Sequence, residues 1–186
     1  MLWPFNHFRK SPAPLRGTIE AIYGMIVAQA REPLFYRSLG VADTVNSRFD
    51  MVVLHLWMVF RELKKTPATD PLHGLSQALF DHFCSDMDHN LREMGTADLR
   101  VPKRMAEFGR AFYGRAAAYD TALAEGVDAL AQSLSKNVYN GADLANARRL
   151  ADYVENTVTA LASVDAKALV AGWKFPVSLV ASVPES

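Results

Sequence analysis

The chain has 186 residues, half of them hydrophobic, and its 20 lysine and arginine side chains balance 20 acidic ones. This length and composition predict one folded domain with a substantial core and exclude a disordered chain. Because the formal net charge is zero, no overall field attracts nucleic acid, and we expect no DNA partner. The single cysteine, Cys84, excludes an internal disulfide framework, and its helical surroundings favour a small buried side chain over a nucleophile.

Residues 1–14 combine prolines with aromatic and basic side chains, which predicts a flexible N-terminal arm. Aromatic rings beside cations are typical of groups at a membrane interface, although such rings can also fold back onto the body of a protein. The membrane-contact candidates are Trp3, Phe5, Phe8, Arg9 and Lys10. No apolar run reaches the ~20 residues that a membrane-spanning helix needs, so any membrane contact would be peripheral.

Helical periodicity begins after this arm. Thr18 can cap a first helix that ends before Pro33, and a short helical turn follows and closes at Gly40. The apolar stretch Arg48–Leu63 then predicts a central helix over about residues 44–65, capped by Asp43 or Thr44.

The central helix carries two apolar sides. Its regular stripe, expected to face the core, is Phe49, Val53, Leu56 and Phe60. Met51, Leu54 and Met58 lie on roughly the opposite side. Two apolar sides indicate either two packing partners or one core and one exposed binding surface, and the sequence leaves both readings open.

Four further long helices are expected. Three lie over about residues 72–94, 102–124 and 127–139, and the fourth begins after a cap at Asp143. One short helix is expected within residues 164–173. Gly114 and Ala118 would allow another helix to approach closely. No segment shows strand alternation. We therefore predict an all-α, single-domain irregular bundle of about six main helices around the central one, with the domain over residues 15–175 and an extended tail over 176–186.

Two groups of histidines raise the question of a metal or haem site. His82, Asp86 and His89 share one face of the third long helix, where they could ligate a metal or form a solvated polar face. His55 interrupts the apolar run of the central helix. It could be a haem ligand, a proton switch, or a buried residue satisfied by one hydrogen bond. The solvated face and the buried histidine are the favoured readings, so we expect no cofactor, no metal and no catalytic residue.

A basic stripe follows the fourth long helix and forms a candidate contact face for phosphates of RNA or lipid, or a plain solvated surface. Its members are Arg100, Lys103, Arg104, Arg110 and Arg115. Only Glu107 interrupts this stripe, and it lacks the aromatic stacking groups of sequence-specific RNA recognition.

Six segments of the chain together carry a family resemblance: Tyr36–Thr44, Arg48–Trp57, Leu75–Asp88, Leu91–Leu99, Pro102–Met105 and Phe112–Tyr119. In combination they resemble the ubiquinol–cytochrome c chaperone family in its alphaproteobacterial form. They occur in the order of the family and cover about half of the chain, whereas the arm and the part beyond Gly126 match less clearly.

The resemblance implies a non-enzymatic assembly factor that binds newly made cytochrome b during biogenesis of the cytochrome bc complex. Mitochondrial relatives work with a small helical partner and associate with the ribosome near its tunnel exit. Because few residues precede the domain, we expect a bacterial cytoplasmic protein, peripheral at the inner face of the inner membrane. The client-binding candidates are Met51, Leu54, Trp57 and Met58. The rival hypotheses are a membrane-associated adaptor with no nascent-chain role and a haem- or metal-binding enzyme.

Overall fold

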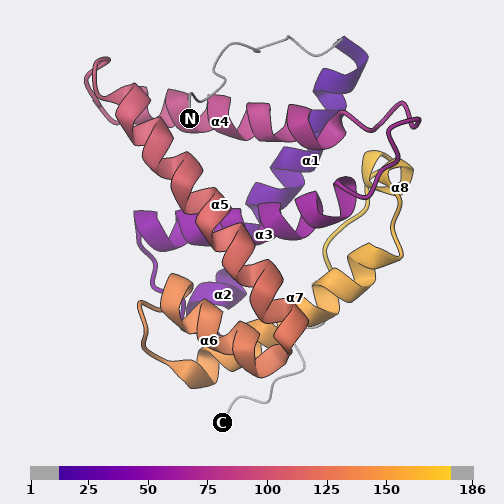
Figure 1. The fold of residues 1–186 in the computed structure, drawn as a ribbon. Helices are drawn as coiled ribbons and strands as arrows, with labels where there is room; N and C mark the ends of the chain where they lie inside the picture. Colours follow the sequence, from indigo (N-terminus) through magenta and orange to yellow (C-terminus); the bar gives the residue numbers. More distant parts are fainter. Residues whose placement is uncertain (1–12, 177–186) are drawn as a thin grey trace.

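The computed structural model describes residues 13–176, and within that range it contains eight helices and no strand (Figure 1). Six helices are long and two are single turns, which confirms the predicted all-α bundle. In chain order they are α1 (Ala13–Ala30), α2 (Pro33–Arg37), α3 (Val45–Leu63), α4 (Leu75–Glu93), α5 (Val101–Glu125), α6 (Val127–Val138), α7 (Leu144–Ala162) and α8 (Ala166–Val170).

Helix α3 lies at the centre of the molecule, as predicted. Thr44 caps it, because its hydroxyl oxygen accepts a hydrogen bond from the Ser47 N–H at 3.2 Å. In Figure 1, α4 lies above α3, α5 crosses it diagonally, and α6 and α7 lie below. All ten residues from 51 to 60 are buried, so the helix is enclosed around its whole circumference.

An aromatic cluster joins α3 to the α4–α5 pair. The Phe60 ring packs against Phe80 and Phe112 at centroid distances of 6.1 and 5.7 Å, and Phe49 stacks on Phe108 at 4.9 Å. These contacts place the regular stripe of α3 in the core, with Phe49 at its partly buried edge. Burial of such rings is the main driving force that holds the three helices together.

The boundaries differ from expectation at two places. Helix α1 begins at Ala13 rather than after Thr18, because Pro14 lies in its first turn, where a missing N–H costs no hydrogen bond. Helix α4 begins at Leu75 rather than Leu72, because the Asp70 carboxylate accepts the Leu72 N–H at 2.8 Å and holds the preceding residues in turns.

The limits of the domain at residues 15 and 175 remain predictions. The predicted flexible arm and extended tail lie almost wholly outside the described residues. No helix within residues 13–176 is both long enough and apolar enough to cross a membrane.

Candidate functional site

The four client-binding candidates on α3 lie in the interior. Met51, Leu54 and Met58 have no exposed surface, and Trp57 is almost fully buried. Successive residues of an α-helix are about 100° apart around its axis, so the first three residues lie on the side of α3 between His55 and Trp57. His55 contacts α7, and Trp57 contacts α5. An exposed apolar side on α3 was therefore the wrong alternative for this conformation, because the helices on both flanks cover it. Whether the four residues contact a client is untested.

The crossing of α3 and α5 is a polar seam. The Trp57 indole N–H and the Arg61 guanidinium both donate to the Asp120 carboxylate, at 3.1 and 2.8 Å. Nearer the N-terminal ends of both helices, the Arg115 guanidinium pairs with the Asp50 carboxylate at 2.7 Å. These donors and carboxylates connect the two helices beside the aromatic cluster. Trp57 and Asp50 are buried, whereas the Asp120 side chain is 52% exposed.

The seam is incompletely satisfied. Burial raises the pKa of Asp50 to about 6, and the neighbouring Arg115 only partly opposes that shift. Three buried polar atoms of the seam have no hydrogen-bond partner within the described chain: Nε of Arg61, Nε of Arg115 and the hydroxyl of Tyr119. Each such atom lowers stability, so this interface is held less firmly than its aromatic contacts suggest.

Only part of the predicted basic face is exposed and unpaired in the structure. Arg115 does not belong to it, because its side chain points inward to Asp50. Arg104 is exposed but pairs with Glu107 at 3.1 Å. Arg100, Lys103 and Arg110 are exposed on α5 and its first turn and have no ion-pair partner among residues 13–176. The usable cations therefore lie near the N-terminal end of α5.

His55 is a satisfied core residue. Its ring has no exposed surface and makes two hydrogen bonds, to the Met51 carbonyl oxygen at 2.8 Å and to the Tyr153 hydroxyl at 2.9 Å. Desolvation lowers the pKa of His55 to about 4, so the ring is neutral at physiological pH. Both ring nitrogens are occupied by protein groups, which leaves none to bind a haem iron.

The face with His82, Asp86 and His89 packs partly against α1 instead of being wholly solvated. The Tyr23 hydroxyl donates to Asp86 at 2.7 Å, and the His82 ring contacts the Tyr23 ring at 5.0 Å. His89 is exposed and lies 3.1 Å from a Glu93 carboxylate oxygen. Within the described part of the chain, no three His, Cys, Asp or Glu side chains gather closely enough to hold a metal ion.

Cys84 is half-buried against the core. Burial raises the pKa of its thiol to about 12, so almost no thiolate forms at neutral pH. This environment fits a packing residue and opposes a nucleophile. The five candidates in the N-terminal arm, Trp3 to Lys10, lie outside the described residues.

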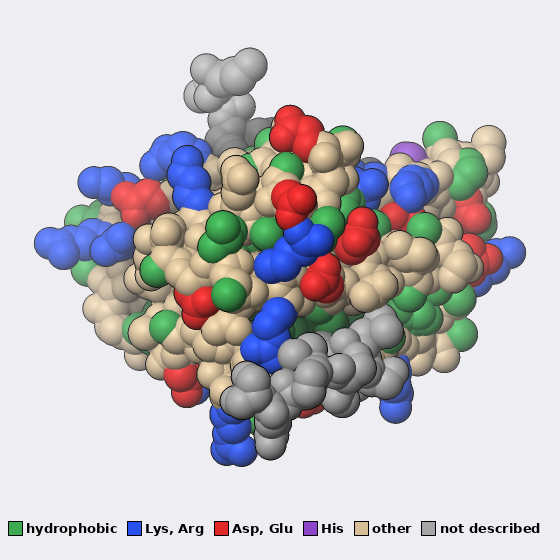
Figure 2. Space-filling model, turned by 90° about the horizontal axis from the view of Figure 1, so that it is seen from below, with side chains coloured by type: hydrophobic (Ala, Val, Ile, Leu, Met, Phe, Trp, Pro, Cys, Tyr) green, Lys and Arg blue, Asp and Glu red, His purple; other side chains and the backbone are tan. Residues whose placement is uncertain are grey.

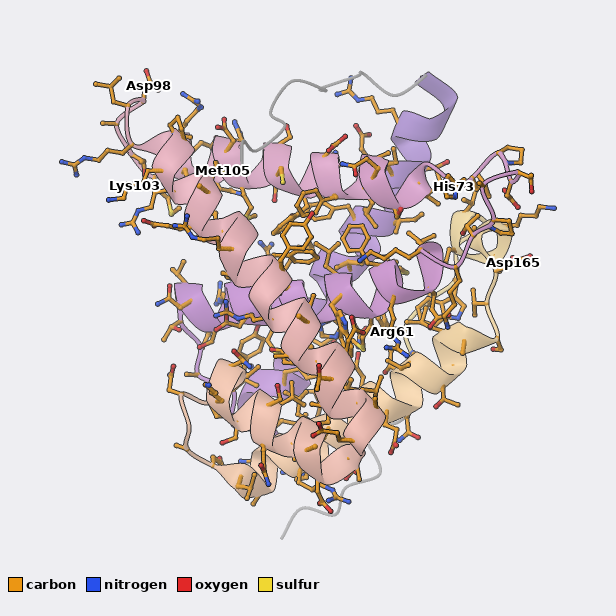
Figure 3. The ribbon with its side chains drawn as sticks, in the orientation of Figure 1. Arg61, His73, Asp98, Lys103, Met105 and Asp165 are labelled. Atoms are coloured by element: carbon orange, nitrogen blue, oxygen red, sulfur yellow. The ribbon has the colours of Figure 1, made fainter. Side chains whose placement is uncertain are left out.

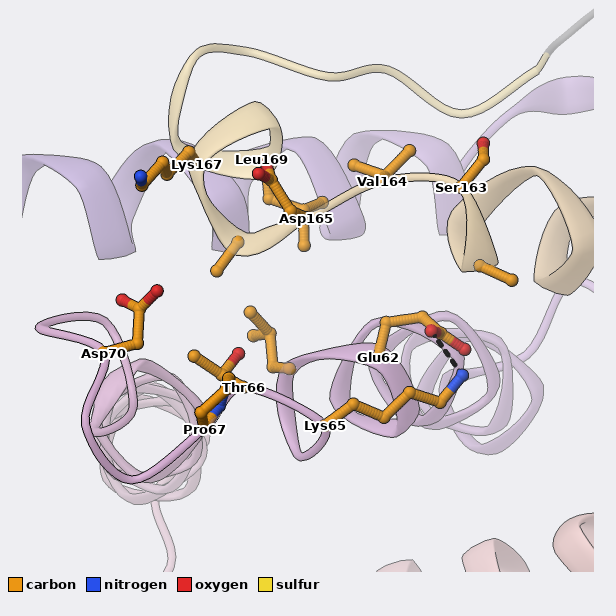
Figure 4. Close-up of a pocket in the computed structure, with 13 residues that line it drawn as sticks. Glu62, Lys65, Thr66, Pro67, Asp70, Ser163, Val164, Asp165, Lys167 and Leu169 are labelled. Carbon is orange, nitrogen blue, oxygen red and sulfur yellow. Dashed lines mark hydrogen bonds and ion pairs between the residues drawn. The ribbon is translucent and has the colours of Figure 1, made fainter.

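A pocket of about 310 Å³ lies between the end of α3, the α3–α4 connection and the turn from α7 to α8 (Figure 4). Glu62 lies at its wall with a side chain only 5% exposed, and one of its oxygens accepts a hydrogen bond from Lys65 at 2.6 Å. Asp70 and Asp165 accept backbone N–H groups of this chain. One Glu62 oxygen, Asp70 and Asp165 thus bind groups of this chain, whereas the other Glu62 oxygen, Oε1, is buried with no hydrogen-bond partner among the described residues.

The face seen from below has no broad surface of one kind (Figure 2). Acidic and basic side chains alternate there with small apolar areas, wherever the grey residues do not cover it. Such interspersed charges are typical of a solvated surface and do not form a docking groove.

Sequence reasoning missed two partners that define these sites. Tyr153 on α7 binds His55, and Asp120 on α5 binds both Trp57 and Arg61. One signal in the sequence could have indicated Tyr153. It carries a polar hydroxyl and lies between the apolar residues Leu150 and Val154. Nothing in the local sequence around Asp120 indicates which helix it contacts.

Known proteins resemble this chain over most of its length. A model of the ubiquinol-cytochrome C chaperone family matches residues 37–175, which include every helix from α3 to α8. The crystal structure of the Cbp3 homolog from Brucella abortus is 35% identical with a TM-score of 0.79, over 91% of this chain and 93% of that one. A search of curated proteins finds no match.

Proposed function

This chain belongs to the ubiquinol–cytochrome c chaperone family, and we therefore propose that it is a non-enzymatic chaperone that binds newly made cytochrome b during assembly of the cytochrome bc complex. The match over residues 37–175 carries the proposal, because it spans the central helix and the helices α4 to α8. The similarity to the Brucella abortus structure supports the same assignment over nine tenths of the chain.

The burial of the α3 side chains bears on how such a client would bind. Met51, Leu54, Trp57 and Met58 are the proposed client contacts, and all four are enclosed in the structure described above. Contact with them requires a second conformation, and movement of α5 off α3 would uncover Trp57, which contacts Asp120 and Tyr119 of α5. The unsatisfied atoms of the polar seam support this step, since they reduce the free energy needed to separate the two helices.

The proposed setting follows from the same family. The protein acts in the cytoplasm, peripheral to the inner face of the inner membrane, and close to the ribosomal tunnel exit while cytochrome b is made. The unpaired cations Arg100, Lys103 and Arg110 would contact phosphates in that setting. A small helical partner subunit is a further expectation from the mitochondrial relatives.

Deletion of the gene tests the function directly. We expect cytochrome b and the assembled bc complex to fall together, with unrelated respiratory complexes unchanged, and expression of the intact chain to restore both. Normal amounts of assembled bc complex in the deletion strain would contradict the proposal.

Site-specific photo-crosslinking tests the client contact. A crosslinking amino acid at Trp57 should capture cytochrome b in cells that are making it, whereas one at Leu144, an exposed position at the start of α7, serves as the matched control. Crosslinks to folded partners alone would favour a membrane-associated adaptor instead.

A further inference from the structure

The end of the α4–α5 hairpin exposes two large apolar side chains. Met94 and Leu99 lie in the connection between the helices, where their exposed fractions are 63% and 95%. In Figure 3 this connection, marked by Asp98, projects beyond the body of the bundle at the upper left. No described element covers these side chains, so they are available to a partner.

Buried flanking residues and hydrogen bonds define the geometry of the hairpin end. Leu91 and Val101, on either side of the connection, are buried. The Thr96 N–H donates to the Leu91 carbonyl at 3.0 Å, and Gly95 provides the positive φ of 79° that ends α4. Arg92 donates to Asp98 at 2.5 Å across the connection. These contacts set the direction in which the two apolar side chains project from the turn.

The same end of the molecule carries an excess of positive charge in a chain whose net charge is zero. Residues 92–110 contain five arginine and lysine side chains and three carboxylates, and Arg92 also pairs with Asp88, just outside this range. Each carboxylate has a neighbour of its own: Asp98 pairs with Arg92, Glu107 with Arg104, and Glu93 lies beside His89. Arg100, Lys103 and Arg110 remain without an ion-pair partner among the described residues.

We propose that this hairpin end binds the surface of a bilayer rich in anionic lipid, with Met94 and Leu99 in the headgroup region and Arg100 and Lys103 on lipid phosphates. Apolar side chains at an apex with cations directly behind them match the layering of a membrane interface. Arg110, about 10 Å further along α5 than Lys103, adds long-range attraction.

The small apolar area favours lipid over a protein partner. A stable protein–protein interface covers about 800 Å² per partner and needs matching shape, which two side chains on a turn do not supply. A bilayer accepts a small apolar group without a complementary pocket. RNA is disfavoured, because no aromatic ring occurs between residues 92 and 107 to stack on a base.

Flotation of the full-length protein with lipid vesicles tests the proposal. Phosphatidylcholine vesicles that contain phosphatidylglycerol should bind the protein and release it as salt rises, and pure phosphatidylcholine vesicles should bind it weakly. Replacing both apolar residues, Met94→Glu with Leu99→Glu, should lower the bound fraction about fivefold or more. Arg100→Gln with Lys103→Gln should weaken binding and flatten its salt dependence.

Leu144→Glu is the matched control, since Leu144 is 56% exposed but lies at the start of α7. It should float like the wild type. Unchanged flotation of the Met94/Leu99 variant would overturn the proposal, and so would an equal loss in the Leu144 variant. Loss of ribosome or RNA binding without loss of vesicle binding would also contradict it. Vesicle binding does not depend on cytochrome b, so this result and the gene-deletion result can fail separately.

Discussion

His55 is an ionisable side chain that the fold keeps neutral. Because the Met51 carbonyl can only accept, Nδ1 carries the ring proton and Nε2 accepts from the Tyr153 hydroxyl. That hydroxyl in turn accepts from the Gln29 side-chain amide at 3.1 Å. Three helices, α1, α3 and α7, are thereby joined through one buried chain of hydrogen bonds, in which each member has a fixed role.

This arrangement predicts acid sensitivity. The pKa of His55 falls from its ordinary 6.5 to about 4 in the folded state, so the unfolded chain binds the proton first. The contribution of His55 is fully present above pH 6.5 and is lost as the pH falls to about 4, by an amount on the order of 3 kcal/mol. Urea unfolding of the wild type and of His55→Leu at several pH values in this range measures it.

His55→Leu should lose this component of the pH dependence. Tyr153→Phe is the control, because it removes the hydroxyl and leaves the histidine buried. It should cost about 1–3 kcal/mol at all pH values and retain the slope. An undiminished slope between pH 6.5 and 4 in His55→Leu would show that other groups cause the acid sensitivity.

At the scale of elements, the connection between α2 and α3 is fixed against the start of α7. The Tyr139 hydroxyl donates to the Leu39 carbonyl at 2.8 Å, and Arg149 donates to the Ser38 carbonyl at 2.7 Å. Gly40 follows with a φ of +65°. These contacts orient the N-terminal end of the central helix, so a strained residue in this connection should affect the whole bundle.

Gly40→Ala should destabilise the protein by about 1–2 kcal/mol, because alanine disfavours a positive φ. Its Cβ would also lie 2.8 Å from the Asn146 side-chain nitrogen. Gly114→Ala is the control: it lies within α5 with nothing within 4 Å of the added carbon, and it should stabilise by about 0.5–1 kcal/mol. Denaturant midpoints measure both, and equal shifts in one direction would contradict the reasoning.

Periodicity and capping residues predicted most helices of this fold, because both are local. Thr44 and Asp143 cap α3 and α7 as expected, and the aromatic stripe of α3 faces the core. Local patterns do not predict contacts between residues that are far apart in the chain. The open space at Gly114, which would allow a close helix, and the inward turn of Arg115 depend on how α5 crosses α3. The covering of Met51 likewise depends on helices far away in the chain.

At the scale of the whole molecule, burial is uneven. Residues 51–60 of α3 have no solvent-facing side, whereas most residues of the connection 92–100 are exposed. Local opening should therefore be frequent at the hairpin end and rare in α3. Local opening at the polar seam between α3 and α5 should be intermediate in frequency between these two regions.

Native-state hydrogen exchange should show this order. We expect the amides of residues 51–60 to exchange only with global unfolding, and those of residues 92–104 to exchange fastest among the helices and the short connection described here. The second half of α5 should exchange through a partial opening, with a free energy below that of global unfolding. Exchange of α5 and α3 at one common free energy would contradict the proposed movement of α5 off α3.

The complete enclosure of α3 has a consequence for how this gene can vary. A helix with one solvent-facing side tolerates substitutions in a repeating pattern of three to four positions, as α7 should with its alternation of buried and exposed residues. Along residues 51–60 no such repeat can exist, because every side chain fills space between neighbours. Inherited change in this segment is therefore confined to replacements of similar volume, or to pairs of changes in which a partner helix compensates.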